Sequence, residues 1–385
     1  MKRIQWGGDI RLRYQGDFYD KNNAILLKPD KPTELMNTTQ DRHRFRIRAR
    51  LEAKAKVTDG VEVGARLSTG NESDPVSTNE TLGDYFNRDG VVLDLAYLKW
   101  EPAPWFKAWA GRFRNPFYST ELVWDEDLNL EGLALRLSPQ ISQPLKGFLT
   151  VGAFPLREVE FSQQDKWLFA GQVGLRWEPS KNFKGILAGA YYEYVNTVGV
   201  LNDPARPGEK DYTAPLFQQK GNTLFDIDPG PGIKTALASA FREINVTGQI
   251  DIGVFDPIHI ILYGDYVRNL GFDREDVARR TGVASVSDET DGYLVGLKVG
   301  HRSVRERMAW RAFVYYKYLE ADAVIDAFTD SDFHLGGTNA KGWVLGGELG
   351  LAKNIWLRGR WLTADQISGP QFGLDVFQLD FNVAF

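Results

Sequence analysis

The chain has 385 residues and a formal net charge of -5, which argues against a nucleic-acid binder by overall charge. It has no cysteine and only 4 histidines. Disulfides and cysteine-based metal sites are therefore excluded, and little material remains for histidine-ligated metals. No stretch approaches the roughly 18 consecutive apolar residues of a transmembrane helix. A membrane β-barrel also lacks such runs, because its strands alternate apolar and polar residues.

Alternation of apolar and polar residues starts within the first few positions. Residues 4–18 alternate over a length above the ~5–6 residues of a typical strand and closer to the ~9–11 of a membrane-crossing strand. Residues 44–57, RFRIRARLEAKAKV, place four arginines on one face of a second segment. An Asp59-Gly60 turn leads into residues 61–68, and Asp-Gly between alternating runs is a strong hairpin signal.

Further alternating segments bring the expected total to about sixteen strands, an even number as bacterial single-chain barrels require. They are 92–100, 106–114, 132–138, 148–154, 167–177, 183–194, 243–252, 258–267, 292–299, 309–318, 343–351, 355–362 and 376–385. No segment shows a sustained helical period. Short and long connections alternate, so we expect every long loop at one end of the barrel and both termini at the other. The longest connection, about 195–240, is interpreted as an extracellular loop rather than a domain boundary.

Three features predict that the apolar face meets lipid. Aromatic residues such as Trp6, Trp177 and Trp310 cap this face near strand ends, as in the aromatic girdles of membrane proteins. Small residues such as Ala49 lie on the same face and would leave a sandwich core underpacked. The last segment, LDVFQLDFNVAF, finishes on an aromatic, as do terminal strands that the barrel-assembly machinery reads. We predict an all-β fold: a transmembrane antiparallel up-and-down β-barrel of about 16 strands, with short periplasmic turns and long extracellular loops, in which residues 1–385 form one domain.

Two segments of the chain resemble the putative-porin family of Gram-negative outer membranes. They are AGRFRNPFYSTELVWDEDLNLEGLALRLS and EADAVIDAFTDSDFHLGGTNAKGW. The resemblance implies a porin-type barrel in the cell outer membrane, in contact with its lipid and lipopolysaccharide, and it implies no known substrate. A homotrimer, typical of sixteen-stranded porins, is expected on the resemblance alone. No signal peptide is expected in this chain, because its first residues run straight into an alternating segment.

A sixteen-stranded lumen is wide enough for water, so the inward faces of the strands would set the function. Alternation places a set of basic side chains on these faces: Arg11, Arg13, Arg44, Arg46, Arg48, Arg50, Arg112, Arg114 and Arg136. Same-face neighbours on a strand are ~6.6 Å apart, so Arg44 to Arg50 form a ladder ~20 Å long. Such a ladder must face water or matching acids.

Acidic residues are available to face this ladder. The predicted third long loop, about 115–129, carries four of them: Glu121, Asp125, Glu126 and Asp127. In general porins the third loop folds into the barrel, and we expect this loop to do the same and to face the arginines. The alternative is an ordinary solvated extracellular loop. Later strands add acids at inward positions: Glu243, Asp251, Asp265, Glu348 and Asp380.

These features favour an outer-membrane porin, a water-filled channel for passive diffusion of small hydrophilic solutes and ions. One alternative is a channel selective for anionic solutes such as phosphate or carboxylates, because guanidinium groups bind them bidentately. Tyr191, Tyr263 and Tyr315 would suit a sugar-like track in such a channel.

A second alternative is an outer-membrane barrel enzyme, which would need a Ser-His or Asp-His constellation. Of the histidines, only His259 is expected inside a strand on the lumen side, so we assign no catalytic residue. Nucleic-acid binding by RFRIRAR is disfavoured by the acidic total. The stretch 330–332, Asp-Ser-Asp, lacks the spacing of a calcium loop, so neither metal nor cofactor is predicted.

Overall fold

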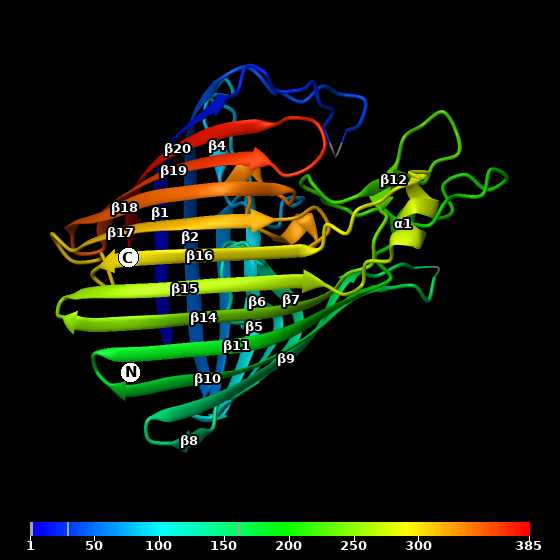
Figure 1. Ribbon diagram of the computed structural model, residues 1–385. Helices are drawn as coiled ribbons and strands as arrows, with labels where there is room; N and C mark the ends of the chain where they lie inside the picture. Colours follow the sequence, from blue (N-terminus) through cyan, green and yellow to red (C-terminus); the bar gives the residue numbers. More distant parts are fainter. Residues whose placement is uncertain (1–2, 29–30, 161) are drawn as a thin grey trace.

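The computed structural model describes residues 3–28, 31–160 and 162–385. Within these residues, sixteen long antiparallel strands close into one barrel, which confirms the predicted architecture (Figure 1). The long strands are β1 (Ile4–Tyr19), β2 (Arg42–Thr58), β3 (Val61–Thr69), β5 (Val91–Ala103), β6 (Phe106–Arg114), β7 (Asn129–Leu137), β9 (Leu145–Arg157), β10 (Lys166–Ser180), β11 (Phe183–Val195), β14 (Arg242–Phe255), β15 (Ile258–Asn269), β16 (Asp291–Gly300), β17 (Trp310–Leu319), β18 (Ala340–Ala352), β19 (Ile355–Gln366) and β20 (Gly373–Ala384).

The barrel closes because the first strand pairs with the last. β1 runs antiparallel to β2 on one side and to β20 on the other, with Asp9 opposite Ala384 and Tyr19 opposite Leu374. Closure leaves no free sheet edge, which a chain in lipid cannot tolerate. Figure 1 shows short turns and both termini at one end of the barrel and the long loops at the other, as predicted.

Eight loops join the strands at the second end, and we number them in chain order. They are L1 (20–41), L2 (70–90), L3 (115–128), L4 (158–165), L5 (196–241), L6 (270–290), L7 (320–339) and L8 (367–372). The short elements of the chain lie in these loops or in one turn: β4 (Glu80–Thr81) in L2, β8 (Gln140–Ser142) in the turn before β9, η1 (Asp211–Thr213), β12 (Leu224–Asp226) and β13 (Thr235–Leu237) in L5, α1 (Arg274–Thr281) in L6, and η2 (Asp326–Phe328) and η3 (Phe333–Leu335) in L7.

Helix α1 was not predicted from the sequence, because two turns are too short to show a helical period. Its ends carry the usual signals: the Asp273 side chain accepts a hydrogen bond from the Asp276 amide, and Gly282 ends the helix with φ of 72°. Among the described residues, no helix has the length and apolar character needed to cross a membrane.

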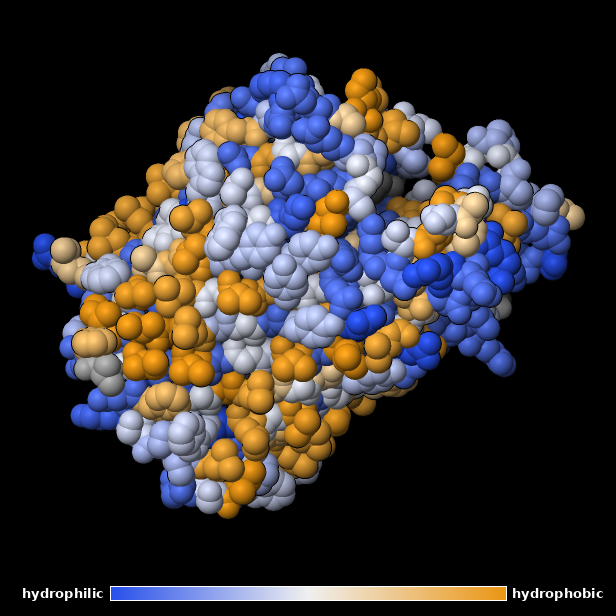
Figure 2. Space-filling view, viewed as in Figure 1, coloured by the Kyte–Doolittle hydropathy of each residue, from blue (hydrophilic) through white to orange (hydrophobic). Residues whose placement is uncertain are grey.

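The two faces of the strands have the polarity of a membrane barrel. On β1, the outward side chains of Trp6 and Leu12 are 67% and 47% exposed, whereas the inward side chains of Arg13 and Asp17 are buried. In a soluble protein the apolar side chains face the interior, and most charged side chains are exposed to water. Figure 2 shows apolar surface over much of the barrel wall and polar surface on the loops.

The Asp59-Gly60 hairpin predicted between the second and third segments joins β2 to β3. Gly60 has φ of 74°, and a Cβ built on it would lie 2.7 Å from the carbonyl oxygen of Glu101. Glycine is required here both for the left-handed backbone and for the close approach of the next turn.

Candidate functional site

A group of arginines covers one side of the lumen, and we call it the basic wall. The antiparallel register of β1 and β2 places Arg11 opposite Arg48 and Arg13 opposite Arg46. Unrelieved, such like-charge pairs would repel each other across the sheet. The basic wall consists of Arg11, Arg13, Arg44, Arg46, Arg48 and Arg50 from these two strands, with Arg358 and Arg360 from β19.

Acids on the neighbouring strand relieve part of this repulsion. Asp17 accepts a 2.6 Å hydrogen bond from Arg44, and Asp9 accepts one of 3.1 Å from Arg48 and one of 2.8 Å from Arg50. Neither aspartate was assigned a role from the sequence. Pairing residues 4–18 antiparallel with 44–57 brings both of them near the ladder, so the signal was present in the alternation.

The basic wall continues across the seam where the barrel closes. Asp380 on β20 lies opposite both Arg13 on β1 and Arg358 on β19. Arg13 donates to it at 2.7 Å, and Arg360 donates to Gln378 at 3.0 Å. Arg358 and Arg360 were also missed, although they alternate with apolar residues in IWLRGRWL.

L3 lies inside the barrel, against inward-facing side chains of several strands. Its carbonyl oxygen at Pro116 accepts from Arg136 of β7 at 3.1 Å, and that at Glu121 accepts from Lys317 of β17 at 3.1 Å. The Thr120 hydroxyl donates to Asp265 of β15 at 2.7 Å. Strands far apart around the barrel therefore hold one loop, which must cross the lumen between them.

The acids of L3 differ in what they face. Asp127 accepts from both Arg48, at 3.3 Å, and Arg50, at 3.0 Å. Glu121 lies 4.0 Å from Arg360. Glu126 is exposed to the lumen. Desolvation inside the barrel opposes ionisation of Glu126, but the arginines of the basic wall outweigh it and lower its pKa to about 2.

Asp125 has another role, because it joins L3 to L7. Its carboxylate accepts from the amides of Asp127, at 2.7 Å, and of Ser331, at 2.8 Å, and its own amide donates to the carbonyl of Phe328 at 2.9 Å. Burial, with the nearby carboxylates of Asp127 and Asp330, raises the pKa of Asp125 well above its usual value. Asp125 therefore faces the second loop rather than the arginines.

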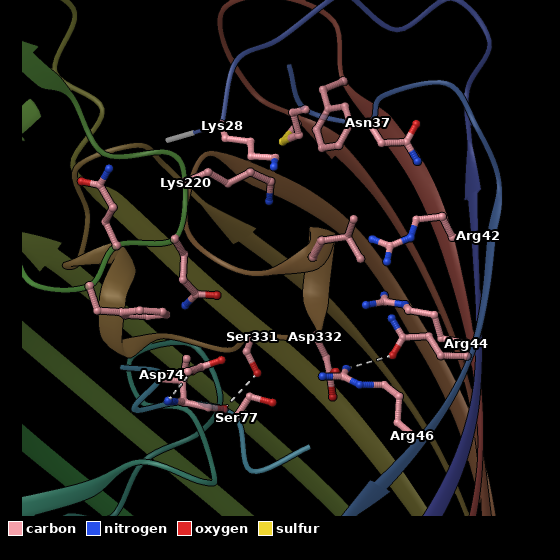
Figure 3. Close-up of a pocket in the computed structure, with 18 of the residues that line it drawn as sticks. Lys28, Asn37, Arg42, Arg44, Arg46, Asp74, Ser77, Lys220, Ser331 and Asp332 are labelled. Atoms are coloured by element: carbon pink, nitrogen blue, oxygen red, sulfur yellow. Dashed lines mark hydrogen bonds between the residues drawn. The ribbon is translucent and has the colours of Figure 1, made fainter. Parts of the chain in front are cut away.

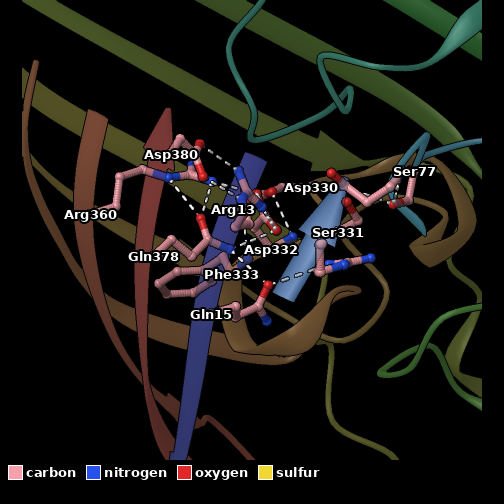
Figure 4. Close-up of polar contacts among 12 residues, drawn as sticks. Arg13, Gln15, Ser77, Asp330, Ser331, Asp332, Phe333, Arg360, Gln378 and Asp380 are labelled. Atoms are coloured by element: carbon pink, nitrogen blue, oxygen red, sulfur yellow. Dashed lines mark hydrogen bonds and ion pairs between the residues drawn. The ribbon is translucent and has the colours of Figure 1, made fainter. Parts of the chain in front are cut away.

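L7 supplies the acid at the centre of the seam (Figure 4). Asp332 accepts from Arg13 at 3.0 Å, from Gln378 at 2.9 Å and also from Arg360. Burial opposes ionisation of Asp332, but the two arginines hold its pKa well below the usual value. L3 and L7 thus dock on each other and present carboxylates to the basic wall at two places, Asp127 and Asp332.

Arg11 of the basic wall donates to Asn79 of L2 at 2.6 Å. The predicted basic residues outside the wall are distributed more widely, and Arg114 donates to Glu52 of β2 at 2.5 Å. Arg136 holds L3, as described above. Arg112 lies apart from this group, in a 2.6 Å ion pair with Glu131.

The tyrosines of the predicted sugar-like track are only partly where expected. Tyr263 and Tyr315 lie on the inner faces of β15 and β17. The placement of Tyr191 in the lumen is wrong: its side chain is 41% exposed on the outer face, and Tyr192 is the buried, inward residue. Residues 183–194 alternate acceptably in either phase, and consecutive tyrosines hide a shift of one residue.

The histidines have structural partners. His43 contacts the Tyr14 hydroxyl, His259 the Asp251 carboxylate, and His334 the Phe372 carbonyl. His259 and Asp251 thus form an Asp-His pair, but among the contacts of the described residues none joins a histidine to a serine or threonine hydroxyl. The same residues hold no cluster of three or more metal-ligating side chains.

Two cavities lie along the basic wall. The first, about 490 Å³, is on the loop side of the constricting loops and is lined by Arg42, Arg44 and Arg46 with residues of L1, L2, L5, L7 and L8 (Figure 3). The second, about 480 Å³, lies deeper and is lined by Arg48, Arg50 and most of L3. The arginine ladder therefore connects the mouth of the barrel to the space beside L3.

The whole chain, residues 1–385, matches the family model described as "Putative porin". The chain belongs to this porin family. The family and the closed barrel together support an outer-membrane channel. Among proteins of curated function, none matches this sequence.

Solved structures share the barrel with this porin. OprB of Pseudomonas putida, at high pH, has a TM-score of 0.56 at 14% identity, covering 99% of this chain and 94% of OprB. Salmonella typhi OmpF in complex with daunomycin has a TM-score of 0.51 at 9% identity, covering 99% and 97%. In-vitro folded OmpT of Vibrio cholerae, in its trimer form, has a TM-score of 0.50 at 11% identity, covering 99% of each chain. At these identities the likeness concerns the fold alone.

Proposed function

We propose that this porin is a water-filled channel for passive diffusion of small hydrophilic solutes and ions, constricted where L3 and L7 face the basic wall. The single observation that carries the proposal is Asp127 of L3, which lies between Arg48 and Arg50 of β2. Because Asp127 contacts the arginines directly, the passage lies beside this ion pair, where the exposed Glu126 of L3 and the arginines of the basic wall produce a local transverse field. Dipolar solutes align with such a field, whereas apolar solutes disrupt the water that it orients.

A second candidate is a channel selective for anionic solutes. It is favoured by unneutralised positive charge in the lumen, since within the residues that the structure describes Arg46 has no carboxylate partner and contacts the neutral side chain of Gln15 at 3.3 Å. Guanidinium groups held in a row bind carboxylates and phosphates bidentately. Ion selectivity separates the two candidates, because a general pore passes cations and anions at comparable rates.

The proposed channel would lie in an outer membrane. Its exposed apolar belt (Figure 2) fits the acyl chains of that membrane, and its long loops fit the lipopolysaccharide leaflet. A homotrimer is proposed on the likeness to OmpT, whose solved form is a trimer. Cross-linking of the protein in detergent, followed by separation without heating, tests the trimer.

Planar-bilayer recording tests the proposed function. The purified barrel should add stepwise, ohmic conductance, and the reversal potential in a salt gradient should report its anion and cation permeabilities. Heat-denatured protein is the control. A barrel that keeps its heat-modifiable mobility but adds no conductance would overturn the proposal, and activity in a panel of bulk hydrolase assays would favour the enzyme alternative.

A further inference from the structure

The cavity at the mouth of the barrel combines a row of arginines with several apolar side chains. On one side, the guanidinium groups of Arg42, Arg44 and Arg46 extend from β2 into a space of about 490 Å³ (Figure 3). Alternate residues of one strand are ~6.6 Å apart, so the three groups form a continuous cationic surface. The volume lies within the range of ~300–1,000 Å³ that is usual for small-molecule sites.

Two of the three guanidinium groups are available to a ligand. Arg44 is neutralised by Asp17 at 2.6 Å. Within the described part of the chain, neither Arg42 nor Arg46 has a carboxylate at salt-bridge distance, and Arg46 contacts the neutral side-chain oxygen of Gln15 through Nη1 at 3.3 Å. A partly buried guanidinium without a charged partner is unfavourable, so an anion that enters the cavity gains by pairing with it.

The acids that line the cavity do not cancel this charge. Asp332 is already bonded to Arg13 and Arg360, which lie on the basic wall beneath the cavity. Asp74 accepts from the amide of Val76 at 3.0 Å, and burial raises the pKa of its carboxyl group. The positive potential of Arg42 and Arg46 is therefore directed into the cavity.

The rest of the lining mixes apolar and polar side chains (Figure 3). Its apolar members are Tyr19, Val76, Phe217, Leu335 and Phe372, from β1, L2, L5, L7 and L8, and Lys28, Asn37 and Lys220 line the same space. Val76, Phe372 and Tyr19 are fixed in position, with 1%, 1% and 5% of their surface exposed. An inorganic anion would leave this surface in contact with water, and a neutral apolar solute would leave the arginines unpaired.

We propose that this cavity is a binding site for small organic carboxylates that carry an aromatic or aliphatic body. The carboxylate pairs with Arg46, Arg42 adds positive potential at the entrance, and the body packs on Phe217 and the neighbouring apolar side chains. The inference rests on the proposed function in one respect, since it makes the site the place where solutes stop before the constriction. Binding itself requires only the folded barrel.

Titration calorimetry on the full-length barrel in detergent tests the proposal with three probes. Benzoate carries both features, benzamide has the body without the charge, and inorganic phosphate has the charge without the body. Benzoate should bind saturably, and the other two should bind at least about tenfold more weakly. Arg46→Gln and Phe217→Ala should each weaken benzoate binding at least about fivefold. Phe217→Ala should leave phosphate binding unchanged.

Arg307→Gln is the matched control, because Arg307 is exposed in a turn at the other end of the barrel. Its benzoate affinity should equal that of the parent protein, and heat-modifiable mobility verifies that every variant is folded. Equal binding of benzoate and benzamide, or of benzoate and phosphate, would overturn the proposal, as would Arg46→Gln and Phe217→Ala variants that bind benzoate normally. Benzoate binding to a barrel that conducts no ions would support the site and contradict only the channel.

Discussion

Replacing Asp127 by asparagine removes the one carboxylate of L3 that is bonded directly to the arginine ladder. The amide side chain would keep the size of the original and one acceptor oxygen, so the ladder loses a negative charge with little change of shape. Arg48 and Arg50 would still share Asp9, at 3.1 Å and 2.8 Å. We expect the passage to become more favourable for anions and less favourable for cations.

The size of this shift follows from Coulomb's law. For an ion that passes about 7 Å from the lost charge in water, the interaction energy is about 0.6 kcal/mol. At 0.1 M salt the Debye length of ~10 Å reduces it to roughly 0.3 kcal/mol. Because the effect has opposite sign for cations and anions, the permeability ratio should move about threefold toward anions.

Reversal potentials in a tenfold KCl gradient measure this ratio. Asp203→Asn is the matched control, since Asp203 is exposed in L5, away from L3. A simultaneous rise in single-channel conductance would show that L3 has also left the ladder. An Asp127→Asn barrel with the parent's reversal potential and the parent's conductance would refute the placement of L3 in the ion path.

Three further results are expected. Replacing Arg46 and Arg48 together by glutamate changes the wall by four unit charges and should move selectivity at least about tenfold toward cations, measured by the same reversal potentials. Asp332→Asn should weaken the docking of L7 by about 3 kcal/mol, because two buried guanidinium groups lose their shared carboxylate, and chymotrypsin should then cleave L7 faster. Burial raises the pKa of Asp326 to about 7 and that of Asp330 to about 6, so docked L7 takes up protons as the pH falls from 7 to 5. Docking of L7 should therefore strengthen as the pH falls from 7 to 5. The buried His334 of L7, whose pKa is lowered by burial, opposes this with a smaller effect. Single-channel conductance should be lower at pH 5 than at pH 7.

The barrel could be predicted from sequence because each strand carries its own signal. Residues 106–114 coincide with β6, and the predicted 183–194 differs from β11 by one residue. The alternation of apolar and polar residues can be read within one strand, without knowing which strands pair with it. Where the alternation is ambiguous, the prediction is wrong only for that strand, as for the side of the sheet on which Tyr191 lies.

The docking of L7 could not be predicted in the same way. L7 is bound to the barrel because Asp332 accepts from Arg13 and Arg360, which are 319 and 28 residues away in the chain. The composition of a loop does not predict whether it folds into the lumen, because the same acidic residues could be exposed to water. The sequence therefore assigned no role to the stretch 330–332, whereas in the structure Asp332 lies among arginines.

The contact between Arg13 and Asp380 joins the first strand of the barrel to the last. Until these strands pair, Arg13 lacks one of its two acidic partners, and the surface of β1, β19 and β20 that binds Asp332 of L7 is incomplete. Pairing of the first strand with the last therefore completes both the barrel wall and the docking surface for L7.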